Sequence, residues 1–391
     1  KPIGKKKGFD RFRAVQEIRQ KRDFPRFVLL ADGDNELTVD LDNVLSVDTF
    51  VDMVKNRGAI RLHEMVPGPG ELLVKGPEGT FVHELSIPFA KNAEQKEATP
   101  QPVSLSPVAR RFAPGSEWLY FKVYGGHSSG DEVLREVIRP VLDEVVPSGA
   151  ADHWFFIRYG DPDWHIRFRF HGDPERLRNE VFPRVQKALD PLLEDNRVYK
   201  IQLDTYEREV ERYGAGAGIE LAEKFFWADS EAILSIVDSL SGDEGADARW
   251  RLAVPGCDRI LSDLGFDLSE KISILKGMKE SWAREFNVNS FFRKKIGERY
   301  RKEEEDLMTL LSPSVPEDHW LYPGIEILNT RSERMVPISA ALREAQEKGK
   351  LSSSLQNIAG SFLHMHNNRL LASSQRAHEV VLYDSAAGAV A

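Results

Sequence analysis

The chain has 391 residues, of which 41% are hydrophobic and 29% charged, and its formal net charge is −9. This composition is that of an ordinary globular protein of two or three domains. The negative net charge argues against a protein that coats nucleic acid. The sequence contains no stretch of about 18 or more apolar residues, the length that a membrane-spanning helix needs, so we expect no membrane span. The single cysteine, Cys257, excludes an intrachain disulfide and a cysteine-rich zinc site. It also fits a reducing compartment, so we expect a cytoplasmic protein.

The first hundred residues predict a small unit of mixed helices and strands. We expect a charged helix over 9–22, two strands within 25–43 around the turn sequence DGDNE, and a helix over 47–58 that ends at Gly58. Three further strands are expected within 59–66, 70–76 and 80–89. Because the chain starts KPIGKKKGFD, without Met or a signal peptide, we expect it to be a piece of a longer protein.

Residues 91–116 differ from what precedes and follows them. They are rich in Pro, Ser, Ala and charged residues, and they show no sustained period. Such a composition is typical of a linker. We therefore expect a first unit over 1–98, a linker over 99–116 and a second domain over 117–385.

The second domain begins with a regular alternation. Its strand, helix, strand, strand, helix and strand are expected over 117–125, 130–146, 152–160, 164–172, 173–196 and from 198 onward. Asp173 is a good cap for the second helix, and Pro174 suits its first turn. The order β-α-β-β-α-β is the ferredoxin-like pattern, and we expect its two helices to cover one face of the sheet.

The rest of the chain predicts a helical bundle. Helices are expected over 219–240, 247–265, 268–285, 288–311, 335–348 and 352–374. The Pro-rich stretch 311–324 interrupts them, and the tail DSAAGAVA is expected to fray. A bundle packed over the open face of the sheet would complete an α+β fold and form a pocket there.

The strand sequence DWHIRFRFHG, residues 163–172, carries an unusual charge pattern. Because side chains alternate along a strand, one face is apolar and consists of Ile166, Phe168 and Phe170. The other face carries three potential cations, His165, Arg167 and Arg169, and Arg158 lies on the preceding strand. Arginine holds a carboxylate through two parallel hydrogen bonds. The hairpin therefore indicates either an anion site or a solvated basic face with structural ion pairs.

The stretch YEREVERYG, residues 206–214, offers a charged pair. Glu209 and Arg212 are i,i+3 neighbours if the chain turns helical after Tyr206. Since the stretch follows a strand directly, the pair lies at the end of the sheet, where binding sites are common. The alternative is a surface ion pair of little energetic weight.

The stretch SFLHMHNNRLL, residues 361–371, brings two histidines into the last long helix. One helix face carries His364, Asn367 and Asn368, and a different face carries His366 and Arg369. Histidines at i,i+2 do not form a helical metal pair, which needs i,i+4. The sequence also lacks a phosphate-binding loop and a nucleophile elbow, so we predict neither a metal nor a cofactor.

Four stretches, in order, resemble the glutamate-elimination domain of lantibiotic dehydratases of the nisin-dehydratase type: GSEWLYFKVYG, FFIRYGDPDWHIRFRF, YEREVERYG and LHMHNNRLL. The same domain occurs in dehydratases of thiopeptide biosynthesis. The resemblance covers residues 112–380. Upstream, PRFVLLADGDNELTVDLDN and RLHEM resemble the end of the tRNA-dependent glutamylation domain. This implies that 1–98 is a C-terminal remnant of that domain.

The resemblance implies a lyase in the biosynthesis of ribosomal peptides such as bacteriocins. In the family, glutamate moves from glutamyl-tRNA to Ser or Thr of a precursor peptide, and its elimination leaves dehydroalanine or dehydrobutyrine. With most of the glutamylation domain missing, this chain is expected to retain elimination, as a fragment or a separate subunit. Its expected partner is the glutamylated precursor peptide, with glutamyl-tRNA engaged only through the missing domain. A cyclase partner and a homodimer stay open.

The resemblance also implies roles for individual residues. It assigns catalysis to Arg169, Arg212, Glu209 and His364. Here Arg212 would clamp glutamate, Glu209 would orient Arg212 or bind the substrate amine, and His364 would act as base or acid. Substrate binding is expected of Arg167, Arg158, Asn368 and His366. His366 is also the alternative to His364, since the register of that match is open. His165 is expected to be a structural residue or to lie at the rim of the site.

Two other functions fit the same residues. One is the related thiopeptide enzyme that catalyses a formal [4+2] cycloaddition between dehydroalanines, and the other is a non-catalytic module that binds the precursor peptide. We expect a cycloaddition enzyme to depart from the set of arginine, glutamate and histidine residues that elimination uses. The presence of that set here favours elimination.

Overall fold

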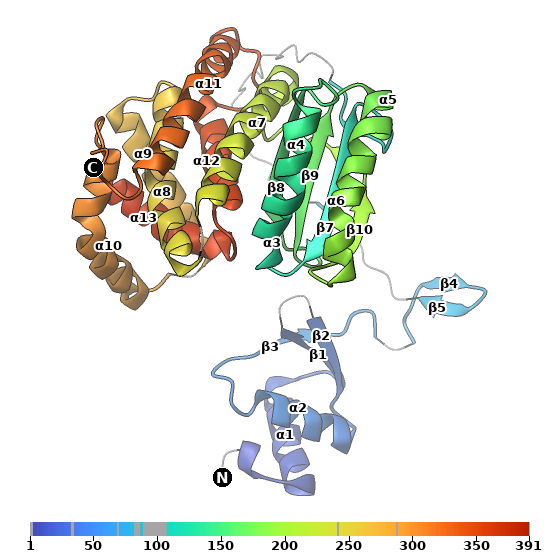
Figure 1. Cartoon of the computed structure of the whole chain (residues 1–391). Coiled ribbons are helices and arrows are strands. Elements are labelled where there is room, and N and C mark those ends of the chain that lie inside the picture. The colour runs from blue at the N-terminus through green and yellow to red at the C-terminus, as the bar shows by residue number, and fades with distance from the viewer. Residues whose placement is uncertain are drawn as a thin grey trace. The chain divides into compact units, whose positions relative to one another are not determined.

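The computed structural model describes residues 3–32, 35–68, 70–81, 87–88, 108–240, 242–286 and 288–390. The chain divides into two compact units, residues 1–98 and 99–391 (Figure 1). Within the described ranges, no helix is both long and apolar enough to cross a membrane.

The first unit packs two helices against a three-stranded antiparallel sheet of order β2-β1-β3. Its elements are a 3₁₀ turn (Ile3–Lys5), α1 (Gly8–Arg22), β1 (Phe27–Asp32), β2 (Asn35–Asp40), α2 (Val44–Val54), β3 (Arg61–Glu64), β4 (Val74–Gly76) and β5 (Gly79–Phe81). The Asn43 side chain caps α2 by accepting from two backbone N–H groups. Helix α2 ends before the expected Gly58, and most of the strand expected over 80–89 lies outside the described residues.

The second unit is built on a four-stranded antiparallel sheet. Its strands, in the spatial order β10-β7-β9-β8, are β7 (Trp118–Gly125), β8 (His153–Tyr159), β9 (His165–His171) and β10 (Val198–Leu203). The connecting helical segments are α3 (Ser129–Glu132), a π-helical stretch (Val133–Ile138) and α4 (Arg139–Val145), then α5 (Pro174–Arg176), a second π-helical stretch (Leu177–Val181) and α6 (Phe182–Glu194). Figure 1 shows α4 and α6 lying across one face of the sheet.

The apolar face of β9 forms the centre of the core. Ile166, Phe168 and Phe170 are fully buried, as the alternation predicted. The Phe168 ring stacks on Phe121 of β7, which in turn stacks on Phe182 of α6. Sheet and helices are thus joined by a continuous aromatic contact.

The remaining helices form a bundle beside the sheet (Figure 1). They are α7 (Ala215–Ser239), α8 (Gly242–Asp263), α9 (Leu268–Glu285), α10 (Ser290–Leu311), α11 (Tyr322–Glu347), α12 (Leu355–Leu370) and α13 (Gln375–Val390). Helices α7 and α12 contact β8, the outer strand of the sheet.

Side chains of α7 and α12 satisfy the free backbone edge of β8. The Phe156 N–H donates to Ser230 Oγ (3.2 Å), and the Phe156 carbonyl accepts from Arg369 Nε (2.8 Å). Two residues further on, the Arg158 N–H donates to Asn368 Oδ1 (2.9 Å) and its carbonyl accepts from Asn368 Nδ2 (2.8 Å). A bare strand edge would invite pairing with another chain. Here side chains of the bundle occupy the edge at Phe156 and Arg158 and fix the sheet to the bundle.

The predicted linker is partly structured. Arg111–Phe112 forms β6, which pairs with β11 (Tyr206–Glu207) in the second unit. Phe112 is buried and stacks on Tyr206, and this apolar contact holds the strand in place. Residues 99–107 of the predicted linker lie outside the described residues.

Two expectations about the bundle were wrong. Helix α11 begins at Tyr322, within the expected break, because Pro323 occupies its first turn, where the missing N–H costs nothing. The tail does not fray, since α13 runs to Val390 and buries Tyr383 and Ala386.

A buried carboxylate joins three helices of the bundle. Asp229 of α7 accepts hydrogen bonds from Arg331 of α11 (3.0 Å) and from His366 (2.7 Å) and Arg369 (3.1 Å) of α12. All four side chains are buried. Burial alone would raise the pKa of Asp229, but His366, Arg369 and Arg331 more than offset it and hold that pKa below its ordinary value.

Replacing Asp229 with Ala should destabilise the second unit by about 3–5 kcal/mol, since it leaves two buried guanidinium groups without their carboxylate. Denaturant unfolding followed by tryptophan fluorescence measures this, because all seven tryptophans lie within 99–391. Glu180→Ala breaks the exposed Arg176–Glu180 pair and should cost less than about 1 kcal/mol. Equal losses for the two variants would contradict the structural role of Asp229.

Two histidines lie side by side where β8 begins and β9 ends. His153 lies opposite His171, with ring centroids 4.4 Å apart. Both Nδ1 atoms approach the Asp152 carboxylate, at 2.5 and 2.8 Å. Burial, reinforced by the neighbouring His171, lowers the pKa of His153 to about 4. His153 is therefore neutral at physiological pH.

This pKa makes the second unit sensitive to acid. The unfolded chain binds a proton at His153 near its ordinary pKa, whereas the folded chain binds it only near pH 4. The contribution of His153 to the free energy of unfolding is therefore complete above about pH 6.5. It is lost as the pH falls towards 4, and the loss amounts to up to about 3 kcal/mol. His153→Gln should flatten this part of the stability profile, and His127→Gln, at an exposed position, should not. An unchanged profile in His153→Gln would refute the assignment.

Candidate active site

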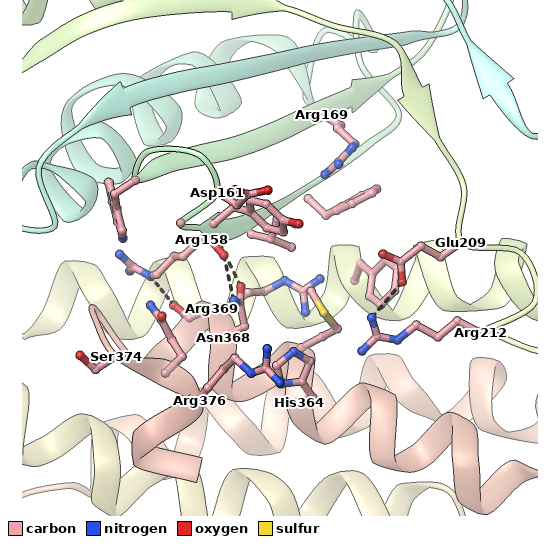
Figure 2. Close-up of a pocket in the computed structure, with 18 of the residues that line it drawn as sticks. Arg158, Asp161, Arg169, Glu209, Arg212, His364, Asn368, Arg369, Ser374 and Arg376 are labelled. Atoms are coloured by element: carbon pink, nitrogen blue, oxygen red, sulfur yellow. Dashed lines mark hydrogen bonds and ion pairs between the residues drawn. The ribbon is translucent and has the colours of Figure 1, made fainter. Parts of the chain in front are cut away.

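A cavity of about 690 Å³ lies between the sheet and the bundle. Its wall combines β8 and β9, the segment around Glu209 and Arg212, α12 and the start of α13. Figure 2 shows the charged residues that face one another across it. Of the residues singled out in the sequence, it brings together Arg158, Arg169, Glu209, Arg212, His364 and Asn368.

Arg169 is a buried cation in an aromatic enclosure. It projects from β9, directly opposite Tyr120 and Phe155 on the neighbouring strands. Its guanidinium carbon lies 4.1 Å from the Tyr120 ring centroid and 4.7 Å from that of Tyr206. Only 6% of the residue is exposed. Burial lowers the pKa of Arg169, but an arginine stays charged at neutral pH.

Within the part of the chain that the structure describes, the buried hydrogen-bond donors of Arg169 have no partner. Among the described residues, no acceptor lies within hydrogen-bond distance of its buried Nε and Nη1 atoms. A buried donor without a partner costs about 1–3 kcal/mol, more when it is charged. The side chain lines the cavity, so an anion bound there would supply the missing acceptors.

Glu209 and Arg212 occupy the turn between β11 and α7. Arg212 Nη1 lies 2.9 Å from Glu209 Oε2, the i,i+3 contact that the sequence predicted, although the segment is a turn rather than a helix. Arg212 Nε also reaches Ser361 Oγ of α12 (3.4 Å). Both side chains are partly exposed, so the pair contributes little to stability and leaves Arg212 accessible from the cavity.

His364 faces the cavity from α12, and a buried carboxylate binds its imidazole on the side away from the cavity. Nδ1 lies 2.9 and 3.1 Å from the two carboxylate oxygens of Glu379 on α13. Glu379 is fully buried, whereas His364 keeps 22% of its side chain exposed. The Trp282 ring lies beside the imidazole, 5.5 Å between centroids. Sequence reasoning missed Glu379 because it lies beyond the last expected helix, 352–374, in a stretch to which no element was assigned.

Arg158 and Asn368 line the cavity, but most of their polar atoms are engaged. Arg158 lies opposite Ile166, so it starts from the apolar face of the sheet, away from Arg169. It donates to Asp131 (2.6 Å) and to the Arg369 carbonyl (2.9 Å), and only its buried Nη1 lacks an acceptor among the described residues. Both ends of the Asn368 amide hold β8, which makes Asn368 a structural residue of the wall.

Two residues expected to bind substrate do not line the cavity. Arg167 donates from Nε to His165 (2.8 Å), and its guanidinium lies over the Tyr159 ring, 3.5 Å from the centroid. His366 points into the bundle towards Asp229, because residues two apart on a helix face different directions. Its neighbour Arg369 does line the cavity, with its buried Nη2 lacking an acceptor among the described residues.

One cluster in the described part of the chain has the composition of a metal site. Asp152, His153 and His171 bring potential ligand atoms within 4.8 Å of one another. The two histidines line a different cavity from the one described above. Since both Nδ1 atoms already lie within hydrogen-bond distance of the Asp152 carboxylate, the cluster is satisfied without an ion.

Comparison with known proteins places this geometry in context. The family model of the lantibiotic biosynthesis dehydratase C-terminus matches residues 118–390. Subtilin biosynthesis protein SpaB of Bacillus subtilis is 24% identical over 375 residues, which are 94% of this chain and 35% of SpaB. Nisin biosynthesis protein NisB of Lactococcus lactis subsp. lactis is 24% identical over 377 residues, with the same coverage. The chain thus spans about a third of the length of these relatives.

Solved structures share the fold. The tRNA dependent lantibiotic dehydratase MibB from Microbispora sp. 107891 matches 99% of this chain and 39% of its own, with a TM-score of 0.56 and 21% identity. TsrL and the pyridine synthase TbtD from thiomuracin biosynthesis each match 70% of this chain, over 94% and 98% of their own length. Their TM-scores are 0.51 and 0.50, at 17% identity. Because the family model covers most of the chain, the protein belongs to the family of lantibiotic biosynthesis dehydratase C-terminal domains.

Proposed function

We propose that the second unit eliminates glutamate from glutamylated Ser or Thr side chains of a ribosomal precursor peptide, which leaves dehydroalanine or dehydrobutyrine. Family membership supports a role in peptide dehydration. The observation that carries the elimination step is the buried guanidinium of Arg169, whose free donors line a cavity shared with Arg212 and His364. A glutamyl ester brings an α-carboxylate and releases a γ-carboxylate, and both are natural partners for arginine.

The proposed step balances without a cofactor. A base takes the α-proton of the modified residue, and the electron pair of that bond becomes the Cα–Cβ double bond. The Cβ–O bond then breaks, and its electron pair leaves on the γ-carboxylate of glutamate. Such a step needs a proton acceptor and a cation near the leaving oxygen.

The geometry suggests one role for each side of the cavity. Arg169 has unpaired donors in a water-poor enclosure, where an electrostatic contact is strongest, so we assign it to the departing γ-carboxylate. Arg212, more exposed and oriented by Glu209, is assigned to the α-carboxylate of the glutamyl group. His364 is assigned to proton transfer, since its imidazole faces the cavity and a ring nitrogen can accept or release a proton.

The scaffold proposal follows the same line. The strands lie in the spatial order β10-β7-β9-β8, and along the chain helical segments connect β7 to β8 and β9 to β10. This arrangement supports a ferredoxin-like unit. For the first unit we propose a remnant of the glutamylation domain, because the curated matches cover 94% of the chain and so extend upstream of the family model, which begins at 118.

A formal [4+2] cycloaddition is the second candidate. The matches to TsrL and to the pyridine synthase TbtD, which span almost all of those chains, favour it. A cycloaddition between dehydroalanines releases no carboxylate, however, and gives no reason to bury an unpaired guanidinium. Elimination accounts for Arg169 and is therefore the better supported function.

The decisive experiment supplies the chain with a precursor peptide that carries glutamate on Ser and follows the peptide mass. We expect loss of the whole glutamyl group, with a net loss of water relative to unmodified peptide. A parallel reaction contains a peptide with two dehydroalanines and no glutamate. Conversion in this second reaction alone would favour the cycloaddition, and conversion in neither would overturn the enzymatic proposal.

Arg169→Ala should accumulate glutamylated peptide, with kcat/KM lower by on the order of 10²–10³-fold, or about 3–4 kcal/mol. Arg139→Ala is the matched control, since Arg139 lies on α4 and pairs with Asp238 outside the cavity. Arg167→Ala should lower kcat/KM less than Arg169→Ala does. Arg167 does not line the cavity itself, but its guanidinium lies over the ring of Tyr159, which does. Wild-type rates in Arg169→Ala would refute its assignment to the leaving group.

A further inference from the structure

A chain of buried hydrogen bonds runs through the bundle to His364. Cys257 Sγ lies 3.6 Å from Asn367 Oδ1, and Asn367 Nδ2 lies 3.2 Å from the Tyr383 hydroxyl. The hydroxyl lies 2.6 Å from Glu379 Oε1, and the Glu379 carboxylate lies 2.9 Å from His364 Nδ1. Every member except His364 is buried. The chain therefore ends at the only member that lines the cavity.

The chemistry of the groups gives this chain a direction. Asn367 donates its amide N–H to the Tyr383 oxygen, so the hydroxyl proton is free to point at Glu379. Burial, together with the Glu379 carboxylate, raises the pKa of Tyr383 well above its ordinary value, and burial raises that of Cys257 to about 12. Both groups consequently keep their protons and remain donors. Glu379 is left as the acceptor at the end of the chain.

The direction determines which nitrogen of His364 carries the proton. A carboxylate that accepts from Tyr383 also accepts from the imidazole, so Nδ1 must be the protonated nitrogen. The lone pair then belongs to Nε2, which makes no hydrogen bond to any residue that the structure describes. The ring of Trp282 lies beside the imidazole and restricts its rotation. In this tautomer Nε2 is therefore the ring nitrogen that can accept a proton.

We propose that Glu379 is a positioning residue for the elimination reaction, which holds His364 in the Nδ1–H tautomer and stabilises the imidazolium once Nε2 has taken the α-proton of the substrate. The inference rests on the proposed function and deepens it by making His364 the base. In the step, the Nε2–H bond forms as the Cα–H bond breaks, and glutamate leaves as its carboxylate. The imidazolium afterwards returns its proton to water.

Glu379→Gln tests the proposal with little change in shape. The amide of Gln presents an N–H to Nδ1, which favours the other tautomer and removes the negative charge behind the imidazole. In the full chain, with glutamylated peptide as substrate, we expect kcat to fall by about 10²–10⁴-fold and KM to stay within about threefold. Asp384→Asn is the matched control, since Asp384 lies on the same helix but pairs with Lys279. This control should retain wild-type kcat.

A double variant separates positioning from a structural effect. If Glu379 acts through His364, then His364→Ala combined with Glu379→Gln should be no slower than His364→Ala alone. Multiplicative losses would overturn the proposal. Tyr383→Phe, which removes one donor but leaves the carboxylate on Nδ1, should retain kcat within about tenfold of wild type. A loss as large as that of Glu379→Gln would shift the role to the hydroxyl and refute ours.

The tautomer of His364 can be measured directly, without an activity assay. In protein labelled with ¹⁵N-histidine, the ring signals of His364, assigned by their loss in His364→Ala, should show the proton on Nδ1. A proton on Nε2 in the wild-type chain would overturn the inference even if Glu379→Gln fails to fold. Absence of elimination by wild type with the expected tautomer would instead count against the proposed function alone.

Discussion

The cavity exists because the outer strand of the sheet finds its hydrogen-bond partners in side chains rather than in another strand. Asn368 and Arg369 of α12, together with Ser230 of α7, take up the backbone groups of Phe156 and Arg158. Behind this contact, the same Arg369 reaches Asp229, which also binds α11. The sheet edge and the buried carboxylate thus form one connected polar structure. Any displacement of the bundle would break several of these bonds at once.

The placement of charge reflects a conflict between stability and function. A guanidinium enclosed by Tyr120, Phe155 and Tyr206 gains cation–π contacts, but these do not replace hydrogen bonds for its buried donors. Asp229 shows that this fold can pair buried arginines when the role is structural. That contrast makes the unpaired state of Arg169 informative, because strain or unsatisfied groups persist where a ligand completes them.

Local patterns predicted the sheet and part of the site, and long-range contacts decided the rest. The alternation in DWHIRFRFHG correctly separated Phe168 from Arg169, and the spacing in YEREVERYG correctly predicted the contact of Glu209 with Arg212. The choice between His364 and His366 needed the bundle, since both lie on one helix and only its packing decides which faces the cavity. The buried end of α13 escaped notice because its small residues resemble a tail, although small side chains also allow close packing.

Helix α12 makes three different contacts within about one and a half turns: it lines the cavity, binds the edge of the sheet and binds the buried carboxylate of Asp229. His364 faces the cavity, His366 faces Asp229, and Asn368 holds β8. Rotation of this helix to suit a different substrate would sacrifice the other two contacts. The start of α13, around Ser374 and Arg376, also lines the cavity, but its side chains make no hydrogen bond to the sheet among the described residues. Substitutions at the start of α13 should therefore reshape the cavity with the least disturbance of the sheet and of Asp229.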